Sequence, residues 1–279
     1  MKAPETSHTT PSRAGTHSVA LAASLALIAF SLRTPITSVG PILLEAVRAT
    51  RLTSAGASLL TTLPSLCFGL FGPIAPMLAR RMSSEQALLL LLALLTVGTA
   101  LRAIPAWPIL YLGQVVACFS IGLMNVLLPG VVKRDFPHHV ALMTGLYSAA
   151  MCAGAATAAA ATAPAANAIG QLLGYTSGNA WAWALAIWAL PAGLATLLWR
   201  SQVPAAGTRT VRTTRAVRGL WRDPLAWQVT LFMGSQSSLA YIVFGWLPTV
   251  LRMRGMNAVD AGLMLSLSVM AQAAASLLL

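Results

Sequence analysis

The chain has 279 residues, of which 57% are hydrophobic and 9% are charged, and its mean hydropathy is +0.74. A soluble domain carries roughly 25% charged residues, so this composition excludes a water-exposed globule and indicates that most of the surface faces lipid. The net charge of +12 fits either nucleic-acid binding or the basic loops of a membrane protein, and the positions of the charges decide between them.

Apolar segments long enough to cross a bilayer follow one another along the chain. Because a bilayer core about 30 Å thick needs about 20 apolar residues per helix, we expect spans at 18–45, 53–78, 85–103, 107–132, 139–163, 179–199, 225–250 and from 258 to the end. A polar tail at 1–17 is expected to be disordered, and a basic linker at 200–223 separates a six-helix bundle (18–199) from a partial second bundle (224–279). The expected fold class is an all-α polytopic membrane protein.

The basic residues divide unequally between the two sides of these spans. Twelve lie on the side of the N-terminus, one (Arg33) lies within a span, and five lie on the other side: Arg48, Arg51, Arg102, Arg252 and Arg254. Cytoplasmic loops carry the excess of Lys and Arg, so we expect a multi-pass inner-membrane protein with a cytoplasmic N-terminus. The split explains the charge without nucleic acid, and the linker is expected to lie near anionic lipid headgroups.

Two hairpins in the chain resemble each other in order and loop length. Gly40-Pro41 and Ala55-Gly56 in the first correspond to Gly245-Trp246 and Ala261-Gly262 in the second, at offsets of 205 and 206 residues; chance similarity between apolar hairpins is the alternative. A parallel repeat of six helices is typical of the major facilitator fold, and two such units predict a complete chain of about 400 residues. The chain ends within an apolar span, and we therefore expect it to be truncated.

Arg33 is the most informative polar residue, because apolar residues extend at least ten positions on either side of it. An arginine at mid-span costs about 2.5–3.5 kcal/mol on insertion scales, and no acidic residue or histidine lies at mid-span to pair with it. An anionic or strongly dipolar ligand would relieve that cost. We therefore expect Arg33 to bind substrate; the alternative is an arginine that snorkels or caps a helix end.

Other polar residues within the spans are weaker candidates for substrate binding. In the facilitator architecture the first, fourth and seventh helices line the central cavity, which makes Asn125, Gln236 and Tyr241 candidate ligands. Hydrogen bonding between helices is the alternative for each. The sequence has no phosphate-binding, metal-binding or nucleophile motif and no Cys pair at metal-site spacing. We expect no catalytic residue, no metal, no cofactor and no enzymatic activity.

Several segments resemble one known family. RTPITSVGP at 33–41, MNVLLPGVVKRDFP at 124–137, MTGLYS at 143–148 and the stretch 224–251 look like the cyanate permease and 2-nitroimidazole transporter family of the major facilitator superfamily. The resemblance covers residues 18–279. It implies a twelve-helix bacterial inner-membrane transporter for a small anionic or nitro-type solute, working by alternating access and as a monomer. A non-transporting eight-helix remnant or scaffold is the alternative.

The resemblance also directs attention to the basic residues between spans. The superfamily's loop between the second and third helices usually carries Gly, then Asp, then a basic pair. Gly72 and the pair Arg80-Arg81 match, whereas Pro76 stands where the Asp is expected. Lys133, Arg134 and Asp135 are the other candidates for gating, as an inner latch, with a solvated loop cluster as an equally good interpretation.

Overall fold

The computed structural model describes residues 13–72, 74–174, 179–203 and 223–278. Helices account for nearly all of this part of the chain, and it contains no strand, which confirms the predicted all-α fold class. The predicted tail (1–17) and linker (200–223) fall largely outside the described residues.

The helices follow the predicted spans closely, with some of the spans divided. Their bounds are α1 Arg13–Thr37, α2 Val39–Thr50, α3 Ser54–Phe71, α4 Ile74–Arg81, α5 Ser84–Leu101, α6 Trp107–Asp135, α7 Val140–Leu173, α8 Ala180–Ala186, α9 Ala189–Arg200, α10 Pro224–Met253 and α11 Ala258–Leu278. Helix α1 starts five residues before the predicted span because its first turn precedes the apolar run. Helix α7 continues ten residues beyond its predicted end, since Pro164 lies inside the helix without ending it.

The first predicted span is divided at Ser38 into α1 and α2, although Ser38 keeps helical backbone angles (φ −67°, ψ −23°) and its N–H donates to the carbonyl of Thr34 at 3.1 Å. Proline has no backbone N–H and cannot donate to the carbonyl four residues earlier, and both Pro35 and Pro41 lie close to the break. The sixth predicted span is likewise divided into α8 and α9 just before Pro191. The hydropathy of the sequence predicts the length of these spans, but it does not predict where single backbone hydrogen bonds are lost within them.

Seven stretches of the described chain are long and apolar enough to cross a membrane. They correspond to all the predicted spans except α10, which has 30 residues. The apolar character of α10 is interrupted by a polar run, Ser235-Gln236-Ser237-Ser238. A polar run within a helix of membrane-spanning length is typical of a surface that faces other helices or a water-filled cavity.

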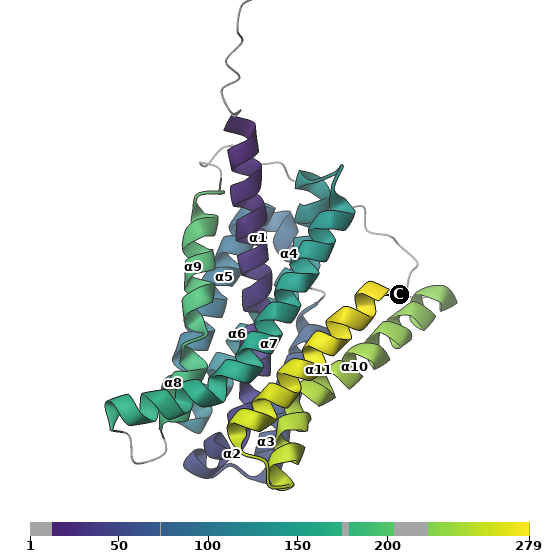
Figure 1. The fold of residues 1–279 in the computed structure, drawn as a ribbon. Coiled ribbons are helices and arrows are strands. Elements are labelled where there is room, and N and C mark those ends of the chain that lie inside the picture. Colours follow the sequence, from purple (N-terminus) through teal and green to yellow (C-terminus); the bar gives the residue numbers. More distant parts are fainter. Residues whose placement is uncertain (1–12, 73, 175–178, 204–222, 279) are drawn as a thin grey trace, which may run out of the picture.

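The helices form an upright bundle with α10 and α11 lying diagonally along one side (Figure 1). The main core lies between α1, α5, α6 and α9, around side chains such as Ile28, Leu92 and Met124. Helix α11 packs against α7, and α10 packs against α2 and α3. We call the end where α1 begins the α1 end, and the end with the α2–α3 and α10–α11 turns the α2 end.

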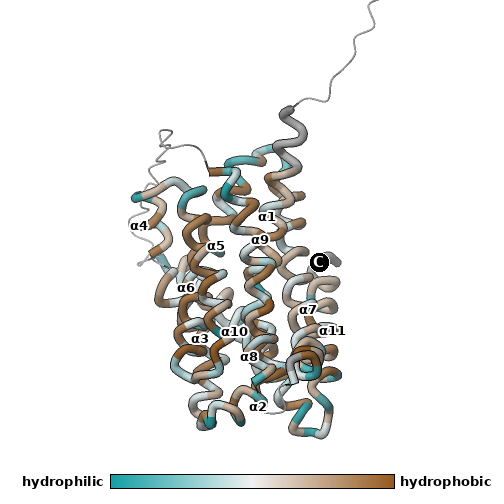
Figure 2. The backbone as a smooth tube through the Cα atoms, turned by 90° about the vertical axis from the view of Figure 1, so that its left-hand side faces the viewer, coloured by the Kyte–Doolittle hydropathy of each residue, from teal (hydrophilic) through white to brown (hydrophobic). Residues whose placement is uncertain are grey.

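Hydrophilic residues gather at these two ends, while the middle of the bundle is mainly hydrophobic (Figure 2). Large apolar side chains also lie on the outer surface, among them Leu70, Leu190 and Phe232. Exposed apolar patches of this extent are unfavourable in water and mark contact with lipid or with other helices. The pattern agrees with a multi-pass membrane protein.

Helix α7 approaches α1 closely through Gly154, where an added Cβ would overlap the backbone carbonyl oxygen of Phe30. Small residues permit such close contact between membrane helices. We predict that Gly154→Ala lowers stability by about 1–3 kcal/mol, because the two helices must separate. The measurement is the midpoint of thermal unfolding in detergent.

Gly145 on the same helix supplies the matched control. A Cβ there meets nothing within 4 Å, so Gly145→Ala should leave the midpoint unchanged or raise it slightly through helix propensity. Equal midpoints for the two alanine variants would show that the contact with Phe30 does not limit stability.

Candidate functional site

Arg33 lies on α1 two residues before Pro35, next to side-chain hydroxyls that hydrogen-bond to backbone carbonyls. Pro35 cannot donate to the carbonyl of Ser31, and the hydroxyl of Thr34 donates to that carbonyl instead, at 3.3 Å. The hydroxyl of Thr37 donates to the carbonyl of Arg33 at 3.1 Å. These two carbonyls of the turn therefore have local hydrogen-bond donors, and the long side chain of Arg33 reaches other helices.

The guanidinium of Arg33 meets two aromatic side chains of α10. Its Nη1 donates to the hydroxyl of Tyr241 at 3.0 Å. Its Cζ lies 5.4 Å from the ring centroid of Tyr241 and 5.8 Å from that of Phe244, which is within the range of cation–π attraction. The edge of Phe68 contacts Tyr241 from α3, with the ring centroids 5.6 Å apart. Arg33 thus joins the six-helix bundle to α10 through charge and aromatic surface.

A cavity of about 260 Å³ opens beside this cluster. Its walls come from α1, α7, α10 and α11, and the lining residues are Arg33, Tyr147, Ser148, Met151, Cys152, Ala155, Ala240, Phe244, Val269, Gln272 and Ala273. Arg33 is the only charged residue among them. The cavity therefore offers one fixed positive charge, hydroxyl and amide groups, and apolar walls.

Arg33 has no carboxylate partner among the described residues. The ion pairs in that part of the chain join Arg134 to Glu85 and Asp135, and Arg252 to Glu45. A half-buried cation that is stabilised only by a phenol and two ring faces attracts an anion or a group with partly negative oxygens. The arrangement suits a small solute that presents such oxygens to the guanidinium.

The structure brings together two of the four predicted ligands, Arg33 and Tyr241. Asn125 is half-buried on α6 and Gln236 is exposed on α10. Of the four predicted ligands, only Arg33 lines the cavity described above, and Tyr241 reaches it through its contact with Arg33. All four stay predictions as ligands. Sequence reasoning did not select Phe244, Tyr147, Cys152 or Gln272 as ligands. The sequence could have indicated Phe244, because a residue three positions after Tyr241 lies on the same face of the helix.

A second cavity, of about 840 Å³, lies at the α2 end between α2, α7 and α8. Its walls all belong to the six-helix bundle and include Glu45, Arg48 and Trp181. A cavity within one bundle does not change when the bundle moves against α10 and α11. The smaller cavity has walls from both parts, and it is therefore the better candidate for a transport site.

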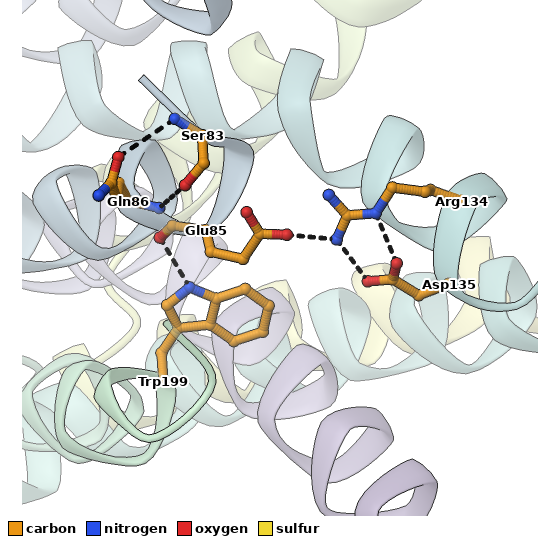
Figure 3. Close-up of polar contacts among 6 residues, drawn as sticks. All are labelled: Ser83, Glu85, Gln86, Arg134, Asp135 and Trp199. Atoms are coloured by element: carbon orange, nitrogen blue, oxygen red, sulfur yellow. Dashed lines mark hydrogen bonds and ion pairs between the residues drawn. The ribbon is translucent and has the colours of Figure 1, made fainter. Parts of the chain in front are cut away.

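The predicted inner latch forms a polar cluster at the α1 end (Figure 3). Arg134 contacts Glu85 at 2.5 Å and Asp135 at 2.6 Å, and the indole N–H of Trp199 donates to the backbone carbonyl of Glu85 at 3.1 Å. A capping box formed by Ser83 and Gln86 fixes the start of α5 beside it.

This cluster ties α5, α6 and α9 together, so its described contacts lie inside the six-helix bundle. Arg80 and Arg81 lie in the last turn of α4, and Lys133 precedes Arg134 on the exposed side of α6. A gating role for Arg80, Arg81, Lys133, Arg134 and Asp135 stays a prediction.

The α2 end holds a polar contact between the two parts of the chain. Arg252, near the end of α10, donates to the carboxylate of Glu45 on α2 at 2.5 Å and to the carbonyl of Pro41 at 3.3 Å. Backbone contact is close here as well: a Cβ on Gly40 would lie 2.7 Å from the carbonyl oxygen of Phe244, and one on Gly262 would overlap the carbonyl of Ala159. The helices at this end are in tight, charge-paired contact.

Comparison with known proteins agrees with this architecture. The sequence model of the Major Facilitator Superfamily matches residues 20–279. The chain is 40% identical over 270 residues to the 2-nitroimidazole transporter of Escherichia coli (strain K12), covering 96% of this chain and 66% of that protein. It is 29% identical over 256 residues to the cyanate transport protein CynX of the same organism, covering 91% and 64%. The chain thus spans less than two thirds of the length of these curated relatives.

Solved structures show the same fold at lower sequence identity. An occupied, inward-facing bacterial homologue of the lysosomal transporter Spinster superimposes with a TM-score of 0.68 at 19% identity, over 91% of this chain and 58% of that one. A D-xylose-proton symporter gives 0.63 at 15% identity, over 94% and 68%. At these identities the likeness shows the fold alone.

Proposed function

This chain belongs to the major facilitator superfamily, and we propose that it acts as a secondary transporter for a small anionic or nitro-type solute. The matched relatives named above confirm the predicted family resemblance and agree with the prediction that the protein is not an enzyme. The observation that carries the proposal is the Arg33 cavity, in which a guanidinium without a carboxylate partner among the described residues faces a space walled by both parts of the chain.

The chemistry of this cavity favours flat or linear solutes with terminal oxygens. A guanidinium is a planar fork that donates two parallel hydrogen bonds to a carboxylate-like or nitro-like pair of oxygens. The rings of Tyr241 and Phe244 lie beside the fork, and Phe244, which also lines the cavity, offers flat apolar surface to the rest of the solute. Two of the relatives carry cyanate and 2-nitroimidazole in their names, and both compounds are small and planar or linear.

Alternating access is the proposed mode of action, and the contacts at the α2 end support it. There α10 and α11 meet the six-helix bundle through the Glu45–Arg252 ion pair and the Gly40 and Gly262 contacts. The first half of α10 is exposed, whereas Phe244, Pro248 and Thr249 in its second half are buried. Contacts concentrated at one end of the helix pair allow it to rock about the solute site.

The proposal places the protein in the bacterial inner membrane with its N-terminus in the cytoplasm, since twelve basic residues lie on that side of the spans. The linker at 200–223 would then lie against anionic lipid headgroups, and we propose that the transporter is a monomer. A scaffold that moves no solute gives no reason for an arginine beside a cavity with no carboxylate partner in the described part of the chain, and it is therefore the weaker interpretation.

Labelling of Cys152 tests the solute site directly. Cys67 and Cys118 are buried, at 3% and 0% exposed, while Cys152 is partly exposed and lines the same cavity as Arg33. We predict that N-ethylmaleimide labels Cys152 and that nitrate or 2-nitroimidazole slows the labelling in a saturable manner. Cyanate is left out of this assay because it reacts with thiols itself.

Two variants make the labelling result specific. Cys152→Ser should remove the label, which identifies the reacting thiol, and Arg33→Gln should remove the protection while leaving the label. Protection that persists in Arg33→Gln, or labelling that neither solute slows at any concentration, would contradict the assignment of this cavity.

A further inference from the structure

Arg102 immediately follows α5, in the short connection to α6. By its position in the sequence it belongs with the arginines outside the spans, yet its side chain is 0% exposed. A guanidinium stays charged at neutral pH even when it is buried. Burying a charge costs free energy unless the charge is hydrogen-bonded. The hydrogen-bond partners of Arg102 therefore indicate its role.

Its partners lie at the break between α1 and α2. Nη1 donates to the carbonyl of Pro35 at 2.9 Å, and Nη2 donates to the hydroxyl of Ser38 at 3.1 Å. That hydroxyl in turn donates to the carbonyl of Pro35 at 3.3 Å. The cation thus sits at the carbonyl end of α1, where the partial negative charge of the helix stabilises it, and it closes a small hydrogen-bonded ring around the break.

The packing of α5 on α6 leaves room for this side chain. An added Cβ on Gly113 would lie 2.6 Å from the carbonyl oxygen of Gly98 and 3.2 Å from Cγ of Arg102. Two helices therefore meet at a glycine pair, and the arginine stem passes beside it to reach α1. The side chain of Arg102 thus lies among three helices, α5, α6 and α1, unlike a charge that only caps the end of one helix.

We propose that Arg102 is a positioning residue for the solute site: it fixes the break after Thr37 and so sets the direction in which Arg33 points. The proposal rests on the function assigned to Arg33 above. Pro35 lies two residues after Arg33, and the hydroxyl of Thr37 holds the carbonyl of Arg33. Fixing Pro35 and Ser38 therefore fixes the turn that carries Arg33, and a shift of about 1 Å at a binding group costs up to about 100-fold in rate.

The first test is a double-substitution cycle that needs no solute. Tyr241→Phe removes the hydroxyl that Arg33 contacts and should lower the thermal unfolding midpoint in the unsubstituted protein. In the Arg102→Gln background the same substitution should lower the midpoint by clearly less, because Arg33 no longer points at Tyr241. An equal shift in both backgrounds would overturn the proposal. Arg48→Gln, at an exposed arginine, is the matched control background and should keep the full shift.

The second test measures transport per folded molecule. Arg102→Gln should raise the KM by about tenfold, and Arg102→Lys, which keeps the charge but loses the fork, should give an intermediate value. Ser38→Ala, which removes one of the two acceptors, should shift the KM in the same direction and serves where Arg102→Gln folds poorly. Less folded protein with an unchanged KM in all three variants would show a purely structural role.

The two tests separate this inference from the function on which it rests. A reduced Tyr241 shift in the Arg102→Gln background, together with transport that Arg33 variants leave unchanged, would show that Arg102 orients Arg33 but would overturn the assigned solute site. Transport that depends on Arg33, together with an undiminished Tyr241 shift, would overturn the positioning role alone.

Discussion

Replacement of Arg33 by alanine is expected to lower kcat/KM for the transported solute by about 100-fold or more, the loss expected when a charge-assisted hydrogen bond of about 3 kcal/mol is removed. The guanidinium is the only charged group among the described residues that line the proposed cavity, so none of these residues supplies a cation in its place. Initial rates of transport in cells that produce the protein measure the effect, with the amount of protein in the membrane determined in parallel.

Graded variants separate the parts of this interaction. Arg33→Lys keeps the positive charge but loses the planar fork, and it should retain part of the activity. Tyr241→Phe keeps the ring next to the guanidinium and removes only the hydroxyl at 3.0 Å, so its effect should be smaller than that of either arginine variant. Arg48→Ala, at an exposed arginine, should transport normally. Normal transport by Arg33→Ala would remove the basis of the site assignment.

Reversal of charge at the α2 end is expected to have the second largest effect. Glu45→Arg would place two cations in the contact that joins α2 to α10, and this end would then resist closure. The side chains are 14% and 36% exposed, so solvent screens the pair in part. We therefore predict a fall of about tenfold in the maximal rate of transport, with little change in KM because the pair does not line the solute cavity.

The exchanged pair, Glu45→Arg with Arg252→Glu, supplies the decisive comparison. It restores opposite charges and should recover most of the rate that each single reversal loses. Recovery should be incomplete because the arginine at 252 also donates to the carbonyl of Pro41, which a glutamate repels. Single reversals with normal rates, or an exchanged pair as slow as the singles, would show that closure of the α2 end does not depend on this ion pair.

Helix positions were accessible from the sequence because membrane spans are set by length and hydropathy. Breaks within spans were not, since they depend on single backbone groups. At the junction of α1 and α2, Arg102 donates to the carbonyl of Pro35 and to the hydroxyl of Ser38, and the hydropathy of the sequence does not reveal such contacts. Of the other proline positions, Pro164 lies within an unbroken α7, so proline alone does not predict where a helix divides.

The solute site stays a prediction, and helix geometry explains why the structure brings only some of its candidate residues together. At about 100° per residue, Gln236 and Tyr241 lie about 140° apart around α10, so they do not share one face, whereas Phe244 lies about 60° from Tyr241. Rotation of α10 is fixed by its contacts with α2 and α3, which the sequence does not display. A polar residue near the middle of a span is therefore a candidate ligand only once the orientation of its helix is known.

Arginines near the ends of spans were the least predictable residues. Arg102, Arg252 and Arg48 are alike in the sequence, each a basic residue next to an apolar run. The first is buried against α1, the second pairs with Glu45 across the two parts of the chain, and the third is exposed. The partners of the first two lie 64 or more residues away in the chain, so only the fold distinguishes these roles.

Flux into liposomes tests the central claim most directly. Uptake of cyanate, nitrate and 2-nitroimidazole is compared between the unsubstituted protein and Arg33→Ala, reconstituted at equal density. The proposed function predicts saturable uptake of at least one of these solutes, with that uptake lost in Arg33→Ala. Saturable uptake that is equal in the two proteins, or uptake of none of the three by the unsubstituted protein, would contradict it.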